Sequence, residues 1–188
     1  MWNTREPIKR FPQTPIQRAN QAENGETQMI TIRPYGPSDS RMTMELFYET
    51  VHTVNARDYS QAQLNVWAPP DRDETEWNHS LLAHDTLVAE EDGRLVGFAD
   101  LGENGYLDRL YVHSAFQGRG VARRLLERIE EKARADRADR IYTFASITAR
   151  GFFEHCGFAV LHENIVDRSG VKLLNFLMQK SLSKHKEG

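Results

Sequence analysis

The stretch from residue 110 to residue 122 constrains the fold more than any other part of the sequence. It reads LYVHSAFQGRGVA, an apolar strand-like run that passes through a loop with Gly118 and Gly120 into an amphipathic helix. The glycines remove side chains where a bulky anion must approach, and the N–H groups and dipole at the helix start favour negative charge. The segment therefore predicts a pyrophosphate site at a strand–loop–helix junction.

The spacing of the glycines excludes two common nucleotide-binding loops. Neither the Gly-x-x-x-x-Gly-Lys-Ser/Thr loop nor the Gly-x-Gly-x-x-Gly loop of dinucleotide folds is present at this place. In the helix that follows, apolar residues recur at helical spacing and predict a buried inner face made of Val121, Leu125, Ile129 and Ala133. The outer face carries mixed charges, which is typical of a solvated surface.

Composition narrows the class of protein. A chain of 188 residues, 39% of them hydrophobic, suits one globular domain, and a net charge of -3 gives no basic field for nucleic acid. No apolar run approaches the roughly 20 residues of a membrane helix, and no signal-peptide pattern is present. The single cysteine, Cys156, cannot form an internal disulfide. We expect a cytoplasmic protein with neither a nucleic-acid partner nor a membrane partner.

The N-terminal half begins with a polar extension. Residues 1–28 combine prolines with polar side chains, so we expect them to be disordered. Residues 29–180 form the predicted domain, and 181–188 a polar tail. The periodicity predicts a helix that Ser38 or Asp39 caps, with Met44, Phe47, Val51 and Val54 as its buried stripe. Capping-box patterns that begin at Ser60 and Asp71 predict two further short helices.

The remaining sequence alternates between strand and helix patterns. Strands are expected at 86–90, 94–101 and 106–112, with tight turns at Gly93 and at Asn104-Gly105. After the helix that starts at Val121, we expect a strand at 140–144, a short helix at 148–156, and a hairpin of strands at 158–166 and 171–180. The predicted class is α/β (α+β).

Two motifs in this order resemble a known family. The pattern Gln117-x-x-Gly120-x-Ala122 after the strand is similar to motif A of the GCN5-related N-acetyltransferase (GNAT) family. The segment 149–158, with Phe152 and Phe153 followed by Gly-Phe, is similar to the family's second signature. More narrowly, residues 59–69 together with 146–149 resemble the YafP-like group of bacterial members.

The resemblance implies both a fold and a coenzyme. The sheet would be mixed, mostly antiparallel and flanked by helices, and it would splay between the strands at 106–112 and 140–144, where acetyl-CoA binds. Backbone groups would pair with the pantetheine arm, and N–H groups of the loop would hold the pyrophosphate. The implied coenzyme residues are Leu110, Tyr111, Val112, Gln117, Gly118, Arg119, Gly120, Val121, Ala122, Ser146, Phe152 and Phe153.

The implied reaction is direct transfer of the acetyl group to an amine in a ternary complex. Asp108 is the candidate base, although it can equally be a solvent-facing residue paired with Arg109. The tyrosine that commonly acts as the acid in this family is replaced here by Phe153, which cannot donate a proton. The remaining candidates for the acid are Tyr111, Tyr142, Cys156, Ser146 or a water. A coenzyme-binding module without catalytic activity is therefore the alternative.

Three aromatic residues are candidates for the acceptor pocket. Tyr59, Trp67 and Trp77 lie in the segment that varies with substrate in the family, although packing in the core explains each of them equally well. The seven histidines do not show metal-ligand spacing, so we expect no metal. The identity of the amine, the general acid and the choice between monomer and homodimer stay open.

Overall fold

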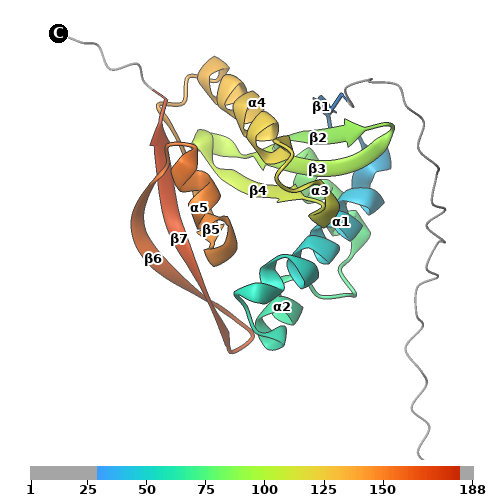
Figure 1. The fold of residues 1–188 in the computed structure, drawn as a ribbon, viewed down its shortest axis with the longest axis vertical. Coiled ribbons are helices and arrows are strands. Elements are labelled where there is room, and N and C mark those ends of the chain that lie inside the picture. The colour runs from blue at the N-terminus through green and yellow to red at the C-terminus, as the bar shows by residue number, and fades with distance from the viewer. Residues whose placement is uncertain (1–28, 183–188) are drawn as a thin grey trace, which may run out of the picture.

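The computed structural model describes residues 29–182. Its helices and strands, labelled in Figure 1, are β1 (Thr31–Pro34), α1 (Ser40–Thr53), α2 (Gln61–Trp67), α3 (Glu74–Leu82), β2 (Asp85–Glu91), β3 (Arg94–Leu101), β4 (Leu107–Val112), α4 (Val121–Ala135), β5 (Arg140–Ser146), α5 (Ile147–His155), β6 (Ala159–Arg168) and β7 (Val171–Ser181). The disorder predicted for 1–28 lies outside the described residues.

The strands form two antiparallel sheets that separate from each other. One sheet has the order β1-β2-β3-β4 and the other the order β5-β7-β6, so β4 and β5 are facing edge strands. A single parallel bridge between Tyr106 and Tyr142 links them. Figure 1 shows the two sheets as separate groups of strands. The predicted fold, a mostly antiparallel arrangement splayed between these two strands and flanked by helices, is confirmed.

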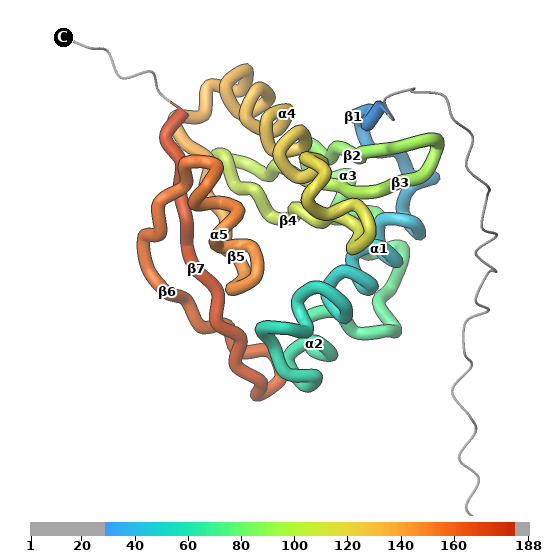
Figure 2. Tube along the Cα trace, viewed as in Figure 1, coloured from blue at the N-terminus to red at the C-terminus, as the bar shows by residue number. Residues whose placement is uncertain are grey.

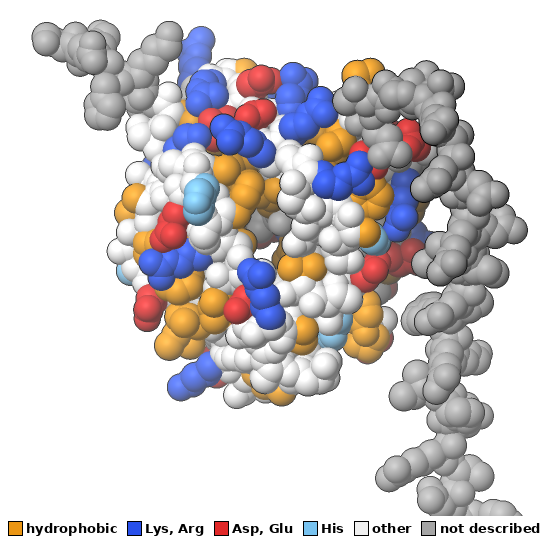
Figure 3. All heavy atoms as spheres, in the orientation of Figure 1, with side chains coloured by type: hydrophobic (Ala, Val, Ile, Leu, Met, Phe, Trp, Pro, Cys, Tyr) orange, Lys and Arg blue, Asp and Glu red, His pale blue; other side chains and the backbone are white. Residues whose placement is uncertain are grey.

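Helices cover both faces of the first sheet. α4 packs on β3 and β4 from one side, while α1 and α3 cover the other. The predicted inner face of α4 is confirmed, because its four apolar residues are each at most 1% exposed: Val121, Leu125, Ile129 and Ala133. Figure 3 shows charges of both signs over the outer face of this helix, as its sequence predicts.

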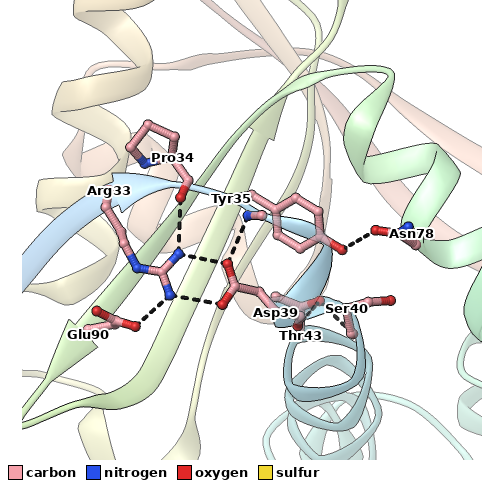
Figure 4. Close-up of polar contacts among 9 residues, drawn as sticks. Arg33, Pro34, Tyr35, Asp39, Ser40, Thr43, Asn78 and Glu90 are labelled. Carbon is pink, nitrogen blue, oxygen red and sulfur yellow. Dashed lines mark hydrogen bonds and ion pairs between the residues drawn. The ribbon is translucent and has the colours of Figure 1, made fainter.

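A polar cluster joins β1 to the start of α1 (Figure 4). The Arg33 guanidinium donates to both carboxylate oxygens of Asp39, at 2.7 and 2.8 Å, and also to Glu90 on β2. The Arg33 hydrogen bonds lower the pKa of the buried Asp39 carboxyl. Asp39 does precede α1, as predicted, but its carboxylate accepts from Arg33 and from the Gly36 N–H and does not cap the helix.

Other local predictions need correction. The capping box at Ser60 is confirmed, but α3 is capped by Asp73 and not by Asp71, because the Asp73 carboxylate accepts from the Glu76 N–H at 2.8 Å. Met44 in α1 and Val54 just after it are half-buried, and the buried face of α1 instead includes Thr43, Leu46 and Thr50.

The predicted domain boundary at residue 180 is also two residues too early. Ser181 pairs with Arg140, and Leu182 is buried with its N–H bonded to the Asp139 carbonyl at 2.8 Å. The rest of the predicted tail lies outside the described residues.

Gly105 permits the close approach of the two sheets, and its replacement tests that contact. Its φ is +78°, and a Cβ would lie 2.1 Å from the Arg140 carbonyl oxygen. We expect Gly105→Ala to lower the free energy of unfolding by at least about 2 kcal/mol, because left-handed strain adds to a backbone clash. Urea denaturation measures the loss.

The matched control is Gly93→Ala in the β2–β3 turn. Gly93 has a similar φ of +74°, but a Cβ there meets nothing within 4 Å. The control should lose only about 1 kcal/mol through strain. Equal losses in the two variants would contradict the importance of the contact with Arg140.

Candidate active site

Two cavities open where the sheets part. The loop cavity, of about 380 Å³, lies between β4, β5 and α5 and extends to the glycine loop before α4. The aromatic cavity, of about 490 Å³, lies among α1, α2, α3 and the β6–β7 hairpin and is lined by Phe47, Tyr59, Trp67 and Trp77 together with polar residues. In Figure 3 the molecular surface is hollowed near the centre of the view, between the start of α4 and α5.

The loop cavity brings together nearly all of the residues that the sequence assigned to the coenzyme. Eleven of the twelve line it: Leu110, Tyr111, Val112, Gln117, Gly118, Gly120, Val121, Ala122, Ser146, Phe152 and Phe153. The exception is Arg119, whose side chain is not part of the lining. Its guanidinium pairs with Glu91 at 2.6 Å and lies over the Phe116 ring at 4.9 Å.

The glycine loop is open beside both glycines, which is what the sequence predicts for the approach of an anion. Gly118 and Gly120 have φ values of +71° and +82°, and the space beside each Cα is open. The first hydrogen bond of α4 runs from the Arg124 N–H to the Gly120 carbonyl. The N–H groups of residues 121–123 therefore have no acceptor within the helix and, with the helix dipole, make this helix start a candidate anion site.

β4 offers a second set of backbone groups beside this loop. It pairs with β3 along one side, for example Ala99 with Leu110, and within residues 29–182 no strand pairs with its other edge beyond Tyr106. An extended ligand can complete the free edge of such a strand with main-chain hydrogen bonds. The edge and the anion site belong to the same cavity.

Five residues line both cavities and form the junction between them: Trp67, Asp108, Tyr111, Phe144 and Ser146. Both residues predicted to be catalytic, Asp108 and Tyr111, belong to this set. Two other acid candidates do not, because Tyr142 stacks on Tyr106 at 5.2 Å and neither Tyr142 nor Cys156 lines either of these two cavities.

The Asp108 carboxylate is held from both sides. The Tyr106 hydroxyl donates to Oδ1 at 2.9 Å, and the Arg109 guanidinium lies 3.1 Å from Oδ2. The predicted alternative, a pair with Arg109, is therefore present at the junction itself. Each carboxylate oxygen still has a second lone pair, so the group retains the capacity to accept a proton.

A buried chain of charges stands behind this carboxylate. Arg109 also contacts Asp100, with Nε 3.1 Å from Oδ1, and His84 Nδ1 lies 2.6 Å from the other oxygen of Asp100. The Asp100 side chain is fully buried, so it depends on these two partners to offset its desolvation. The hydrogen bond to Asp100 raises the pKa of His84.

The Tyr111 phenol stays protonated at neutral pH. Its ring packs on Phe98 and edge-on against Phe47, and burial raises the pKa of Tyr111 above its usual 10.0. Ser146, the other acid candidate at the junction, has a structural role. Its oxygen accepts from the Ala149 N–H at 3.1 Å and caps α5.

The three aromatic candidates line the aromatic cavity and also hold the structure together. The Tyr59 hydroxyl accepts from the Ile147 N–H at 2.9 Å and donates to the Leu174 carbonyl at 2.7 Å. The buried Trp77 donates from Nε1 to Thr43 at 3.0 Å. All three residues therefore line the cavity, and Tyr59 and Trp77 also have a structural role.

The sequence analysis missed several contributors to the cavities. The C-terminal end of α1 and the turn after it add Thr50, Val54, Asn55 and Arg57 to the loop cavity, and Arg123 lines it although it had been assigned to the solvated face. In the aromatic cavity, the missed residues include Arg72 and the hairpin residues Asn164, Arg168 and Asn175. The sequence did offer a signal for Arg72, because this residue lies between Trp67 and Trp77, two of the candidates for the acceptor pocket.

One group of side chains has the proximity of metal ligands. Ligand atoms of His84, Asp100 and Asp108 lie within 4.8 Å of one another. The Arg109 guanidinium contacts both carboxylates, so a fixed cation already supplies the positive charge that an ion would bring. The cluster fits a charge network better than a metal site.

Comparison with known proteins agrees with this geometry. Residues 55–182 match the family model described as acetyltransferase (GNAT) domain. The N-acetyltransferase YafP of Escherichia coli is 33% identical over 150 residues, which cover 80% of this chain and 95% of YafP. The chain belongs to the GNAT family, and the predicted resemblance to the YafP-like group is confirmed.

Solved structures give the same fold. A GCN5-related N-acetyltransferase from Rhodopseudomonas palustris is 33% identical, with a TM-score of 0.79 over 85% of this chain and 99% of that protein. YncA from Salmonella typhimurium, solved with acetyl-CoA, has a TM-score of 0.64 at 23% identity over 85% and 98% of the two chains, and this likeness concerns the fold. Among residues 29–182 no helix is long and apolar enough to cross a membrane.

The His84–Asp100 pair predicts a pH dependence of stability. Because the folded pKa of His84 is raised, its contribution is complete below the ordinary value of about 6.5 and is lost as the pH rises through the raised pKa. We expect the difference in free energy of unfolding between wild type and His84→Gln to be largest near pH 6 and to shrink toward alkaline pH. Chemical denaturation across this range measures it, and a difference independent of pH would contradict the pairing.

Proposed function

We propose that this protein transfers the acetyl group of acetyl-CoA to an amine in a ternary complex. The observation that supports the proposal is the junction, where one carboxylate and one protonated phenol, Asp108 and Tyr111, line both cavities. In this proposal, acetyl-CoA occupies the loop cavity and the amine enters from the aromatic cavity. The anion site before α4 fits the pyrophosphate, and the free edge of β4 fits the pantetheine arm.

The reaction needs one group to accept a proton and another to supply one. The neutral amine attacks the thioester carbonyl carbon, so a C–N bond forms and the C–S bond breaks. A proton leaves the amine for the Asp108 carboxylate, directly or through a water, and Tyr111 gives its phenolic proton to the departing thiolate. Proton exchange with solvent then restores both side chains. A thiolate with a pKa near 8.5 is already a fair leaving group, so the acid has less to contribute than the base.

The chain behind Asp108 supports its role as the base. Tyr106 and Arg109 fix the direction of the carboxylate, and Asp100 with His84 fixes Arg109. Rotamers locked in this way keep a reacting group in position before the substrate arrives. The alternative is that Asp108 only forms a surface ion pair with Arg109. Such a pair would not need a buried carboxylate behind it, so this arrangement favours the catalytic role.

Replacing Asp108 by Asn tests the base. We expect kcat to fall about 10²-fold or more, because general-base catalysis contributes at least that much, while acetyl-CoA affinity measured by calorimetry stays nearly unchanged. Turnover is followed as release of free thiol with a panel of amines. The matched control is Asp136→Asn, at the C-terminal end of α4, which lines neither cavity and should retain full activity. Full activity of Asp108→Asn would remove Asp108 from the base role.

Replacing Tyr111 by Phe tests the acid and keeps the ring packing. We expect a loss in kcat of about 10-fold, smaller than for Asp108→Asn, with little change in KM for acetyl-CoA. Tyr142→Phe removes the same hydroxyl from a residue that lines neither cavity, so its kcat should be unchanged. If Tyr111→Phe changed kcat no more than Tyr142→Phe does, the result would argue for a solvent water as the acid.

The same assays separate catalysis from the alternative of a binding module. That alternative was suggested by Phe153, which is buried in the core and stands where a tyrosine is common in the family. Tight acetyl-CoA binding without thiol release on a broad amine panel would support it. The presence of Tyr111 at the junction is the reason that we favour the enzyme.

A further inference from the structure

The aromatic cavity has an excess of positive charge. Its lining contains three arginines, Arg72, Arg109 and Arg168, and the carboxylate of Asp108 is the acidic group among the lining residues. A pocket for a simple cationic amine would be expected to have the opposite balance, because like charges repel the incoming ligand. The three guanidinium groups differ in how far their charge is already neutralised within residues 29–182.

The charge of Arg109 is neutralised within the protein. It contacts the carboxylates of Asp100 and Asp108, donates to the Ser80 hydroxyl at 3.0 Å, and lies over the Trp77 ring at 5.1 Å. Its Nε, like that of Arg72, is buried without a hydrogen-bond partner, but the two carboxylates beside Arg109 already balance its charge.

Arg72 has no such neutralisation. Its guanidinium lies over the rings of Phe47 and Trp77, at 5.1 and 5.4 Å, and one NH2 donates to the Trp67 carbonyl at 3.1 Å. Its Nε is buried without a hydrogen-bond partner, and among the residues described here no carboxylate lies within ion-pair distance. Burial, followed by the nearby charge of Arg168, lowers the pKa of Arg72. A half-buried cation left in this state costs free energy that a bound anion would offset.

Arg168 brings a second cation to the same place. It ends β6, and the hairpin that carries it reaches α2, where Gln63 donates to the Lys172 carbonyl at 2.8 Å. Figures 1 and 2 show this end of the hairpin beside α2. No ion pair of Arg168 with a carboxylate is found among residues 29–182. Two arginines from distant parts of the chain thus converge without a protein anion between them, and planar guanidinium groups suit a carboxylate.

We propose that the acceptor is a small amino acid or a close derivative, whose carboxylate is bound by Arg72 with Arg168 while its amino group faces Asp108. This inference rests on the proposed function, because it names the substrate class of the same site. The volume of about 490 Å³ suits a small molecule, and the aromatic and aliphatic lining leaves room for an apolar side chain.

Matched acceptors test the carboxylate. The common L-amino acids are each compared with their amide and with the decarboxylated amine, and kcat/KM is measured by thiol release with acetyl-CoA. We expect wild type to prefer the carboxylates by at least about 10-fold, as a charge-assisted hydrogen bond would give. Equal or better use of the amides and amines, or of phosphorylated amines, would overturn the proposal.

Variants assign the preference to Arg72. Arg72→Gln should lower kcat/KM for carboxylate acceptors about 10- to 100-fold, leave the amides nearly unaffected, and leave acetyl-CoA affinity unchanged. Arg128→Gln, on the exposed face of α4 and outside both cavities, is the control and should behave as wild type. If Arg72→Gln does not fold, the exposed Arg168→Gln decides, with the same selective loss expected at about 3- to 10-fold. Loss on both acceptor classes alike would contradict the assignment.

A binding experiment keeps this inference separate from the proposed reaction. Protein saturated with coenzyme A is titrated calorimetrically with the same amino acids and amides. Binding that requires the carboxylate and disappears in Arg72→Gln supports the inference. If such binding is seen but no acceptor is acetylated, the proposed catalysis is wrong and the inference about the ligand stands. Absence of any carboxylate-dependent binding or turnover overturns the inference.

Discussion

The separation of β4 from β5 is the constraint on which the rest of the site depends. Within residues 29–182, the backbones of the two sheets pair at one bridge, between Tyr106 and Tyr142, whose rings also stack at 5.2 Å. Gly105 precedes this bridge in a left-handed conformation, against the carbonyl of Arg140. Beyond it the two edges diverge, and both cavities open along them. If β5 continued to pair with β4, the backbone groups of β4 would be occupied and no cavity would exist there.

The two arginines near the opening, Arg109 and Arg72, differ in whether a carboxylate of the protein lies beside them. Asp100 is completely buried and would be costly without Arg109 and His84, yet through Arg109 it fixes the carboxylate of Asp108 at the junction. Arg72 also lies over the Trp77 ring but lacks an anion among the described residues. One arginine therefore serves the protein's own carboxylates, and the other is available to a ligand. The same aromatic residue packs against both.

Local rules were sufficient for much of the fold. The buried face of α4 follows from apolar spacing, and the turn at Asp92-Gly93 adopts the positive φ values that its sequence predicts. Where several local partners compete, prediction failed: Asp73 caps α3 in place of Asp71, and Asp39 binds Arg33 in place of the helix. The choice at Asp39 depends on residues brought close by the fold, such as Glu90 on β2 beside Arg33, whereas the Asp73 cap is a local bond to the Glu76 N–H.

The sequence by itself determined the strand–loop–helix unit with Gly118 and Gly120, because every part of it is made by residues adjacent in the chain. It also brought Asp108 and four acid candidates into consideration, but it could not rank those candidates. Only the tertiary structure decided that Tyr111 reaches the junction while Tyr142 turns to Tyr106, and that Arg72 meets the β6–β7 hairpin. The physical reason is that these contacts join residues from separate elements, and their distances are set by how two sheets pack and diverge.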